Sequence, residues 1–168
     1  QRQTSETPGS RRLAAMRAYV EALGALGDYY HHEYGQGNRD VIAVLGREEA
    51  DLRHAWQLAR KHGWFWRVTG TMQGLRVLYA QTGRRAAWRA LVEAVEPEFV
   101  DAEGGPLPGR EEQYSLINEY LGRLAQEVRD WETAEKWARA KLAWWRERAT
   151  PLLTSESDLT GNNTVRWL

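Results

Sequence analysis

Apolar side chains recur along this chain in steps of three and four residues, the spacing that lines one face of an α-helix. Leu13, Met16, Val20 and Leu23 belong to the first such series, and further series follow as far as about Arg148. Glycine and proline separate the series, and no stretch alternates apolar and polar residues as a β-strand does. The pattern predicts an all-α protein made of antiparallel helix hairpins.

The separating residues set the boundaries of about six predicted helices. Gly46 is expected to end a short helical turn that precedes the second helix, and Pro97 is expected to end the fourth. The expected helices cover residues 10–34, 48–62, 64–82, 84–96, 110–128 and 130–148.

These elements divide the chain into a flexible leader, residues 1–9, and a single domain, residues 10–168. Loops are predicted at 101–109 and, beginning at Pro151, at 151–163. Within the domain we expect an irregular first helical pair at 10–62, one repeat at 64–96, a second repeat at 110–148, and a short C-terminal helical turn at 164–168 where a further helix starts.

Two of the predicted hairpins repeat one pattern at a fixed distance along the chain. Four positions recur 46 residues later: Leu75, Tyr79, Gly83 and Trp88 correspond to Leu121, Ala125, Arg129 and Ala134. The regular offset predicts two copies of one helix–turn–helix unit, stacked side by side.

The second copy resembles a tetratricopeptide repeat. Leu121-Gly122, Trp131, Ala134 and Leu142 agree with the pattern of that family. A tetratricopeptide repeat is about 34 residues long, and the loop between Glu98 and Gly109 accounts for the excess in the present offset. The resemblance implies a solenoid of antiparallel hairpins.

The first copy matches the tetratricopeptide pattern at Leu75, Tyr79 and Gly83. Trp88 departs from the pattern, because a bulky ring stands where the family has a small alanine, and the two helices around it are expected to splay apart. In the second copy Ala125 and Arg129 also depart from the pattern.

A second resemblance covers Glu48 to Val95. This stretch is similar to the helical segment that follows the ATPase module in bacterial signal-transduction ATPases of the STAND type, and similar arrays precede CHAT protease domains. The resemblance implies a sensor or scaffold segment of a bacterial signalling protein and no more.

Charge and composition narrow the partner classes. Lys plus Arg and Asp plus Glu number 23 each, and no basic stripe is visible, so we expect no nucleic-acid partner. The apolar runs are too short to cross a bilayer and no signal peptide is visible, which predicts no membrane contact and a cytoplasmic location. The absence of cysteine excludes disulfides and thiolate metal sites.

The sequence offers little catalytic chemistry. His31-His32-Glu33 and the pair Asp51 and His54 are ligand-like groupings, but a metal site in a helix bundle needs more carboxylates and histidines than these supply. A phosphate-binding Gly-rich loop ending in Lys-Ser or Lys-Thr is missing, as is a serine nucleophile elbow. We therefore expect no enzyme activity, no metal and no cofactor.

The tetratricopeptide resemblance implies a binding groove, because the first helices of such hairpins line a concave face. We expect this groove to hold an extended or helical peptide, or a protein partner, through hydrogen bonds and charge pairs. Arg84-Arg85 is read as a solvated pair or an acidic-peptide contact. The groove positions map onto Gln73, Val77, Gln81, Leu116, Glu119, Arg123, Gln126 and Glu127.

Two other functions stay open. The helix that starts at 164–168 would expose Trp167 and Leu168, and such a surface favours self-association into a homo-oligomer. The chain also has nine tryptophans, which fill space between helices in most proteins. A pocket around Trp64, Trp66 and Trp88 would instead make the domain a small-molecule sensor.

Overall fold

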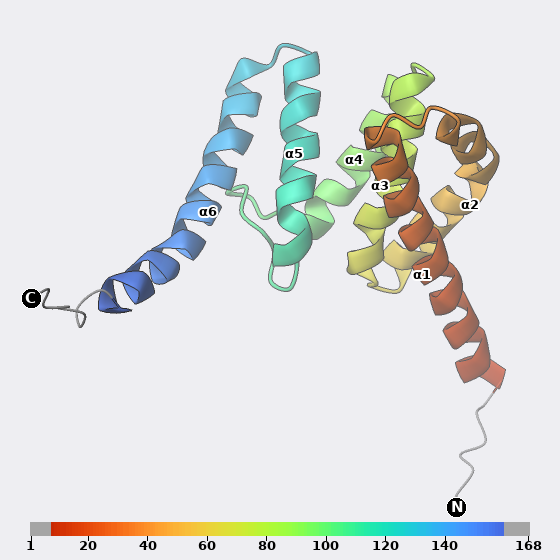
Figure 1. Ribbon diagram of the computed structural model, residues 1–168, viewed down its shortest axis with the longest axis horizontal. Helices are drawn as coiled ribbons and strands as arrows, with labels where there is room; N and C mark the ends of the chain where they lie inside the picture. The colour runs from red at the N-terminus through yellow and green to blue at the C-terminus, as the bar shows by residue number, and fades with distance from the viewer. Residues whose placement is uncertain (1–7, 160–168) are drawn as a thin grey trace, which may run out of the picture.

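The computed structural model describes residues 8–159, with side chains described from Pro8 to Ala149. This part of the chain is all-α and forms an array of hairpins, as the apolar spacing predicts (Figure 1). The predicted turn at 164–168, with Trp167 and Leu168, lies outside the described residues, as do residues 1–7 of the predicted leader. The helices are α1 (Pro8–Gly35), α2 (Val41–Lys61), α3 (Phe65–Gln81), α4 (Arg85–Phe99), α5 (Glu111–Glu127) and α6 (Trp131–Leu159).

Two helices differ from their predicted bounds: α1 begins earlier than expected, and α2 continues through an expected break. α1 begins at Pro8, two residues before the predicted start at Ser10, and proline is favoured in the first turn of a helix. α2 is continuous through Gly46, so the prediction of a separate turn ending there was wrong. Leu45 and Leu52 are fully buried on the same helix, and their packing outweighs the cost of about 1 kcal/mol for an exposed helical glycine.

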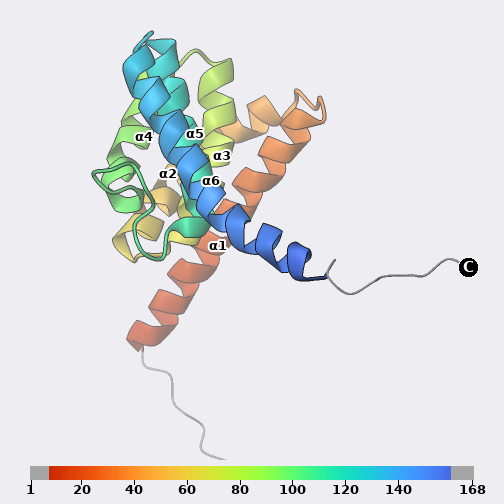
Figure 2. The same ribbon diagram turned by 90° about the vertical axis from the view of Figure 1, so that its left-hand side faces the viewer.

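Pro97 and Pro151, which were expected to break or follow helices, instead lie inside them. α4 passes through Pro97 and ends at Phe99, whose ring is fully buried. An interior proline costs a helix about 3 kcal/mol, and the burial of Phe99 together with the contacts of Glu98 outweighs this cost. α6 continues through Pro151 to Leu159, so the loop predicted at 151–163 is helical as far as residue 159. Figure 2 shows this last part of α6 running past the other helices.

The repeat of 46 residues is present in the backbone. α3 and α5 have the same length and begin and end 46 residues apart, and so do the starts of α4 and α6. The turns match too: Arg84 N–H donates to the Tyr79 carbonyl, and Asp130 N–H donates to the Ala125 carbonyl, both at 2.9 Å. These bonds close the same type of helix cap, in which one residue has a left-handed backbone conformation; in the first copy this residue is Gly83.

The first helical pair follows the same plan as the two repeats. Its turn closes with Asn38 N–H donating to the Glu33 carbonyl, and Gly37 has a positive φ of 95°. The turn from α2 to α3 uses the same device at Gly63. The fold is therefore three successive hairpins, α1–α2, α3–α4 and α5–α6, within the described residues.

Glycines allow α1 and α3 to cross in close contact. Gly24 and Gly27 of α1 lie against Gly70 and Gly74 of α3. A Cβ atom on Gly27 would lie 2.2 Å from the Gly70 carbonyl oxygen, and one on Gly74 would lie 3.0 Å from the Gly27 Cα. The two helices therefore approach closely, and α1 packs more extensively on α3 than on its hairpin partner α2.

The first helices form a continuous row and the second helices do not. α1 contacts α3 and α3 contacts α5, whereas the backbones of α2, α4 and α6 stay apart from one another over the described residues. We call α1, α3 and α5 the inner row of helices, and α2, α4 and α6 the outer row. α3 and α4 also meet less extensively than α5 and α6.

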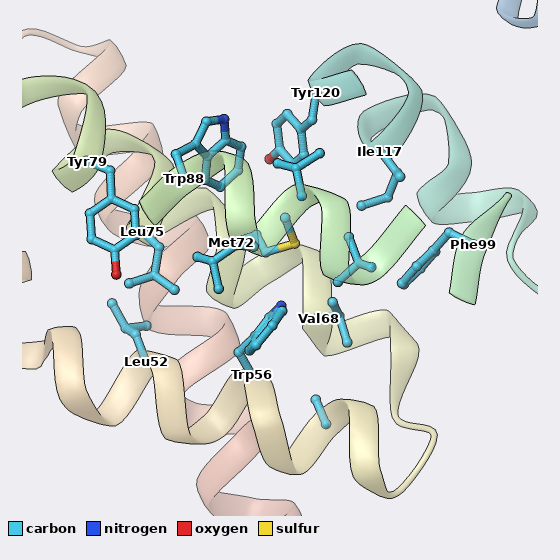
Figure 3. Close-up of a cluster of buried hydrophobic side chains, with 14 of the residues drawn as sticks. Leu52, Trp56, Val68, Met72, Leu75, Tyr79, Trp88, Phe99, Ile117 and Tyr120 are labelled. Carbon is cyan, nitrogen blue, oxygen red and sulfur yellow. The ribbon is translucent and has the colours of Figure 1, made fainter. Parts of the chain in front are cut away.

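α3 is the centre of the core. Its residues Met72 and Leu75 are fully buried, and the side chains around them come from α2, α4 and α5 (Figure 3). Burial of each aliphatic side chain of this size contributes about 1.5–3 kcal/mol. Trp88 of α4 meets Tyr120 of α5 edge to face, with ring centroids 4.9 Å apart. This aromatic contact joins the second hairpin to the third.

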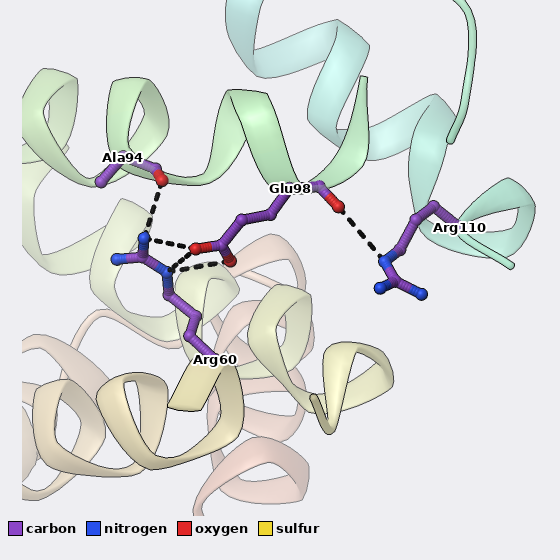
Figure 4. A network of polar contacts seen from close by, with 4 residues as sticks. All are labelled: Arg60, Ala94, Glu98 and Arg110. Carbon is purple, nitrogen blue, oxygen red and sulfur yellow. Dashed lines mark hydrogen bonds and ion pairs between the residues drawn. The ribbon is translucent and has the colours of Figure 1, made fainter. Parts of the chain in front are cut away.

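Polar contacts tie the separated second helices together. Arg60 of α2 donates to the Glu98 carboxylate at 2.6 and 3.0 Å and to the Ala94 carbonyl at 2.8 Å (Figure 4). The Glu98 carbonyl accepts a hydrogen bond from Arg110, at the start of α5. One arginine thus bridges α2 and α4 where their backbones do not touch.

Candidate functional site

The inner row of helices carries a connected set of polar side chains. An Arg76 Nη of α3 contacts the His31 Nε2 of α1 at 2.7 Å. The Tyr120 hydroxyl of α5 donates to the Gln73 Oε1 of α3 at 2.8 Å, and the Arg76 guanidinium lies 5.9 Å from the Tyr120 ring centre. Side chains of all three first helices therefore meet on one face.

A hollow of about 230 Å³ lies beside this set, between α3, α4 and α5. We call it the arginine pocket, because Arg76, Arg85 and Arg123 reach it from three different helices. Trp88 and Tyr120 form an aromatic wall, and Glu127 supplies the single carboxylate among the described residues that line it. Tyr79 and Ala80 complete the lining.

Burial determines the charge states around the arginine pocket. Burial, and then the positive charge of Arg76, lower the pKa of His31, so the imidazole is neutral at pH 7 and its Nε2 accepts from Arg76. Burial raises the pKa of the Tyr120 phenol, which therefore stays protonated and donates to Gln73. The Arg76 guanidinium contacts His31 and has no carboxylate partner among the described residues.

Arg76 is also incompletely hydrogen-bonded. Its Nε atom is buried and has no partner within the described residues. A buried donor without an acceptor costs about 1–3 kcal/mol.

The predicted groove residues fall into different environments. Gln81 is exposed at the end of α3, while Gln73 is already bonded to Tyr120. Val77 is only 5% exposed and packs in the core, so its assignment to a groove was wrong. Leu116 packs against the core from α5 and is partly covered.

The remaining predicted residues lie on α5 and line two hollows, and Arg123 lines both. Arg123 and Glu127 line the arginine pocket. Glu119, Arg123 and Gln126 line a second hollow of about 340 Å³ between α5 and α6, with Lys141 on its far side. Arg123 pairs with Glu119 at 2.8 Å, and its side chain is 59% exposed, so it is free to reorient toward a ligand.

Sequence reasoning missed the residues at the centre of the site. His31 was considered only as a metal ligand, and Arg76 and Tyr120 were not singled out. A signal existed on α3, because Gln73, Arg76 and Ala80 follow helical spacing and lie on one face. The family pattern instead led to Val77, one residue further along the helix.

The other sequence candidates have structural partners. Asp51 accepts a hydrogen bond from Tyr19 at 2.8 Å, and the His54 ring lies against the same tyrosine, so both residues attach α2 to α1. Arg84, next to Arg85, is bound by Glu49 at 2.6 and 2.9 Å. No group of three or more histidine or carboxylate side chains within the described residues is placed to hold a metal ion.

The three tryptophans proposed for a sensor pocket do not come together. The Trp66 Nε1 donates to Glu21 on α1, and the Arg17 guanidinium lies over its ring. Trp88 faces α5, where it contacts Tyr120. Trp64 stacks on the ring of His62. The three indoles therefore contact different parts of the fold.

Comparison with known proteins gives no relative for this chain. No helix within residues 8–159 is both long and apolar enough to cross a bilayer. No protein family matches the sequence, no curated protein matches it, and no solved structure matches the fold.

Proposed function

We propose that this chain is a non-catalytic binding module, of the tetratricopeptide type, which holds a peptide segment of another protein on the inner face of α1, α3 and α5. The observation that carries the proposal is the convergence of His31, Arg76 and Tyr120, one from each first helix, beside an open hollow. Such a face offers a line of donors, acceptors and aromatic surface that a peptide backbone and its side chains can use.

The frame behind this face favours binding without rearrangement. Three hairpin turns within the array close with the same backbone hydrogen bond, and α1 is locked on α3 through backbone contacts at Gly27 and Gly70. Long side chains such as Arg123 and Gln126 remain exposed on this rigid support. Affinity is greater when the scaffold is ordered in advance, because less conformational entropy is lost on binding. A role as sensor or scaffold segment in a larger signalling protein accords with this arrangement.

The experiment is a selection of short random peptides displayed on phage against the immobilised domain, followed by affinity measurements on the selected peptides. Arg123→Glu is expected to weaken binding about tenfold or more, because it removes one charge-assisted hydrogen bond. Arg47→Glu is the matched control, since Arg47 is an exposed residue of α2 and the change in charge is the same.

Circular dichroism accompanies both variants, so that loss of binding is separated from loss of folding. Selected peptides that bind Arg123→Glu as tightly as the wild-type protein would count against the proposed face. Equal weakening by Arg47→Glu would show that only net charge matters, and would also contradict the proposal.

A further inference from the structure

The arginine pocket has more positive charge than its surroundings use. Arg84, the neighbour of Arg85, is bound by the Glu49 carboxylate and lies over the Tyr79 ring. Arg85 and Arg76, in contrast, form no ion pair with any carboxylate in the described part of the chain. Two cations without internal counter-charges thus stand on adjacent helices of one pocket.

The third cation can be redirected. Arg123 pairs with Glu119 across one turn of α5, but both side chains are exposed to solvent, and exposed pairs of this kind contribute little energy. Glu127, which also lines the pocket, is exposed as well. A second acceptor could therefore bind Arg123 at small cost.

The size and walls of the pocket indicate which anion fits. A volume of about 230 Å³ is that of roughly seven or eight water molecules, enough for one acidic side chain but small for most cofactors. Trp88 and Tyr120, both largely buried, form the apolar part of the pocket wall, against which the methylene groups of such a side chain would lie. Guanidinium groups bind the two oxygens of a carboxylate with parallel hydrogen bonds.

We infer that the arginine pocket receives the carboxylate of an acidic side chain in a peptide lying across α3 and α5, bound by Arg85 and Arg123 at the rim and by Arg76 at the base. This inference rests on the proposed function, because it assigns the peptide class to the same inner face. It adds that Arg76, whose Nε has no acceptor among the described residues, gains a carboxylate partner in the complex.

The experiment follows the arginine Nε–H resonances of the ¹⁵N-labelled full chain by NMR while a probe peptide is added. The probe is acetyl-Glu-Glu-Glu-Glu-amide, and the matched control peptide is acetyl-Gln-Gln-Gln-Gln-amide. We expect the acidic peptide to shift the resonances of Arg76, Arg85 and Arg123, and the glutamine peptide to leave them in place. Inorganic phosphate is added in a separate titration, as a free anion without peptide character.

Two variants and one control test the assignment. Arg85→Gln, at the exposed start of α4, should weaken binding of the acidic peptide about tenfold without disturbing the fold. Arg76→Gln should weaken binding of the acidic peptide at least as much. Because Arg76 is half-buried, the backbone amide spectrum of this variant is compared with that of the wild-type protein to show that the variant is folded. Arg47→Gln should bind the acidic peptide as the wild-type protein does.

Unchanged affinity in Arg85→Gln would overturn the inference, and so would equal binding of the two peptides. Phosphate shifting the three resonances while the acidic peptide does not would also overturn it, because the pocket would then take a free anion. The proposed function is tested separately by the peptides from the phage selection. If these peptides are neutral and bind Arg123→Glu more weakly than the wild-type protein, the binding face is supported and only the assignment of a carboxylate ligand is contradicted.

Discussion

Gly27→Ala is the substitution that most severely tests the packing of the array. Gly27 lies where α1 crosses α3, and an added Cβ would be 2.2 Å from the Gly70 carbonyl oxygen and 3.1 Å from the Gly70 carbonyl carbon. Carbon–oxygen contacts normally start near about 3.3 Å. The two helices would therefore have to separate by about 1 Å, and the obstructing atoms belong to the backbone, so no rotamer change relieves the contact.

The magnitude follows from two opposing effects. Alanine is the better helix former by about 1 kcal/mol, which favours the variant. Overpacking costs about 1–3 kcal/mol and occasionally more, and this site is at the upper end because a whole helix must move away from α3. We expect a net loss of about 2 kcal/mol in the free energy of unfolding. For a chain of this size, that loss lowers the melting temperature by about 4–8 °C.

Gly46→Ala provides the matched control. Gly46 lies inside α2, is exposed, and an added Cβ would meet no atom within 4 Å. Here only helix propensity acts, and we expect the control to be more stable than the wild-type protein by about 0.5–1 kcal/mol. Both variants are measured by urea unfolding followed by circular dichroism. If Gly27→Ala were as stable as Gly46→Ala, the close crossing of α1 and α3 would be refuted.

Two further predictions concern the turn and the ion pair that position the hairpins. Arg129 is the one described non-glycine residue with a positive φ, 60°, and it lies at the cap position that Gly83 occupies in the preceding repeat. Because glycine adopts a positive φ without strain, Arg129→Gly should raise the free energy of unfolding by about 1 kcal/mol in urea titrations. A less stable variant would contradict the shared cap. The hydrogen bond from Arg84 holds the pKa of Glu49 below 4.5, so this pair stabilises the folded state above about pH 4.5 and its contribution disappears as the pH falls through the lowered pKa. Glu49→Gln should therefore be less stable than the wild-type protein by about 1–2 kcal/mol at pH 7, and the difference should shrink below pH 4.5; a difference that grows on acidification would exclude the assigned role of Glu49.

The sequence predicts α3 and α5 better than any other elements. Their expected ranges, 64–82 and 110–128, exceed the observed helices by one residue at each end. α3 ends beside Gly83 and α5 beside Arg129, and both residues have a positive φ. Such caps depend on local backbone geometry, which short sequence patterns indicate. The offset of 46 residues between the copies is likewise a local property, because it is fixed by helix and turn lengths.

The errors in the predicted helix ends occur at glycine and proline, and at Gly46 and Pro97 distant contacts outweigh the local preference. Gly46, Pro97 and Pro151 are each strong helix-ending signals, yet all three lie inside helices. The bond between Arg60 and Glu98, which helps to hold α4 in place beyond Pro97, joins residues 38 positions apart and cannot be found from spacing. Tertiary packing commonly overrides propensity in this way.

The candidate site was only partly visible in the sequence. Arg123 and Glu127, which were expected to line a groove, line the arginine pocket, whereas Val77, which was expected there too, is buried in the core. The contact between His31 and Arg76 depends on how α1 crosses α3, and that crossing depends on glycines whose partners a single sequence does not specify. The charge balance of the arginine pocket likewise emerges only once three helices are assembled.

The most direct test of the binding face is photo-crosslinking with a peptide from the phage selection. A benzophenone amino acid is introduced in place of Gln126 on α5, in place of Gln81 on α3, or in place of Arg47 on α2, which are all exposed positions. If the inner face of α1, α3 and α5 binds the peptide, crosslinks form from positions 126 and 81 and not from position 47. Crosslinking that is strongest from position 47, on the outer row of helices, would contradict the account.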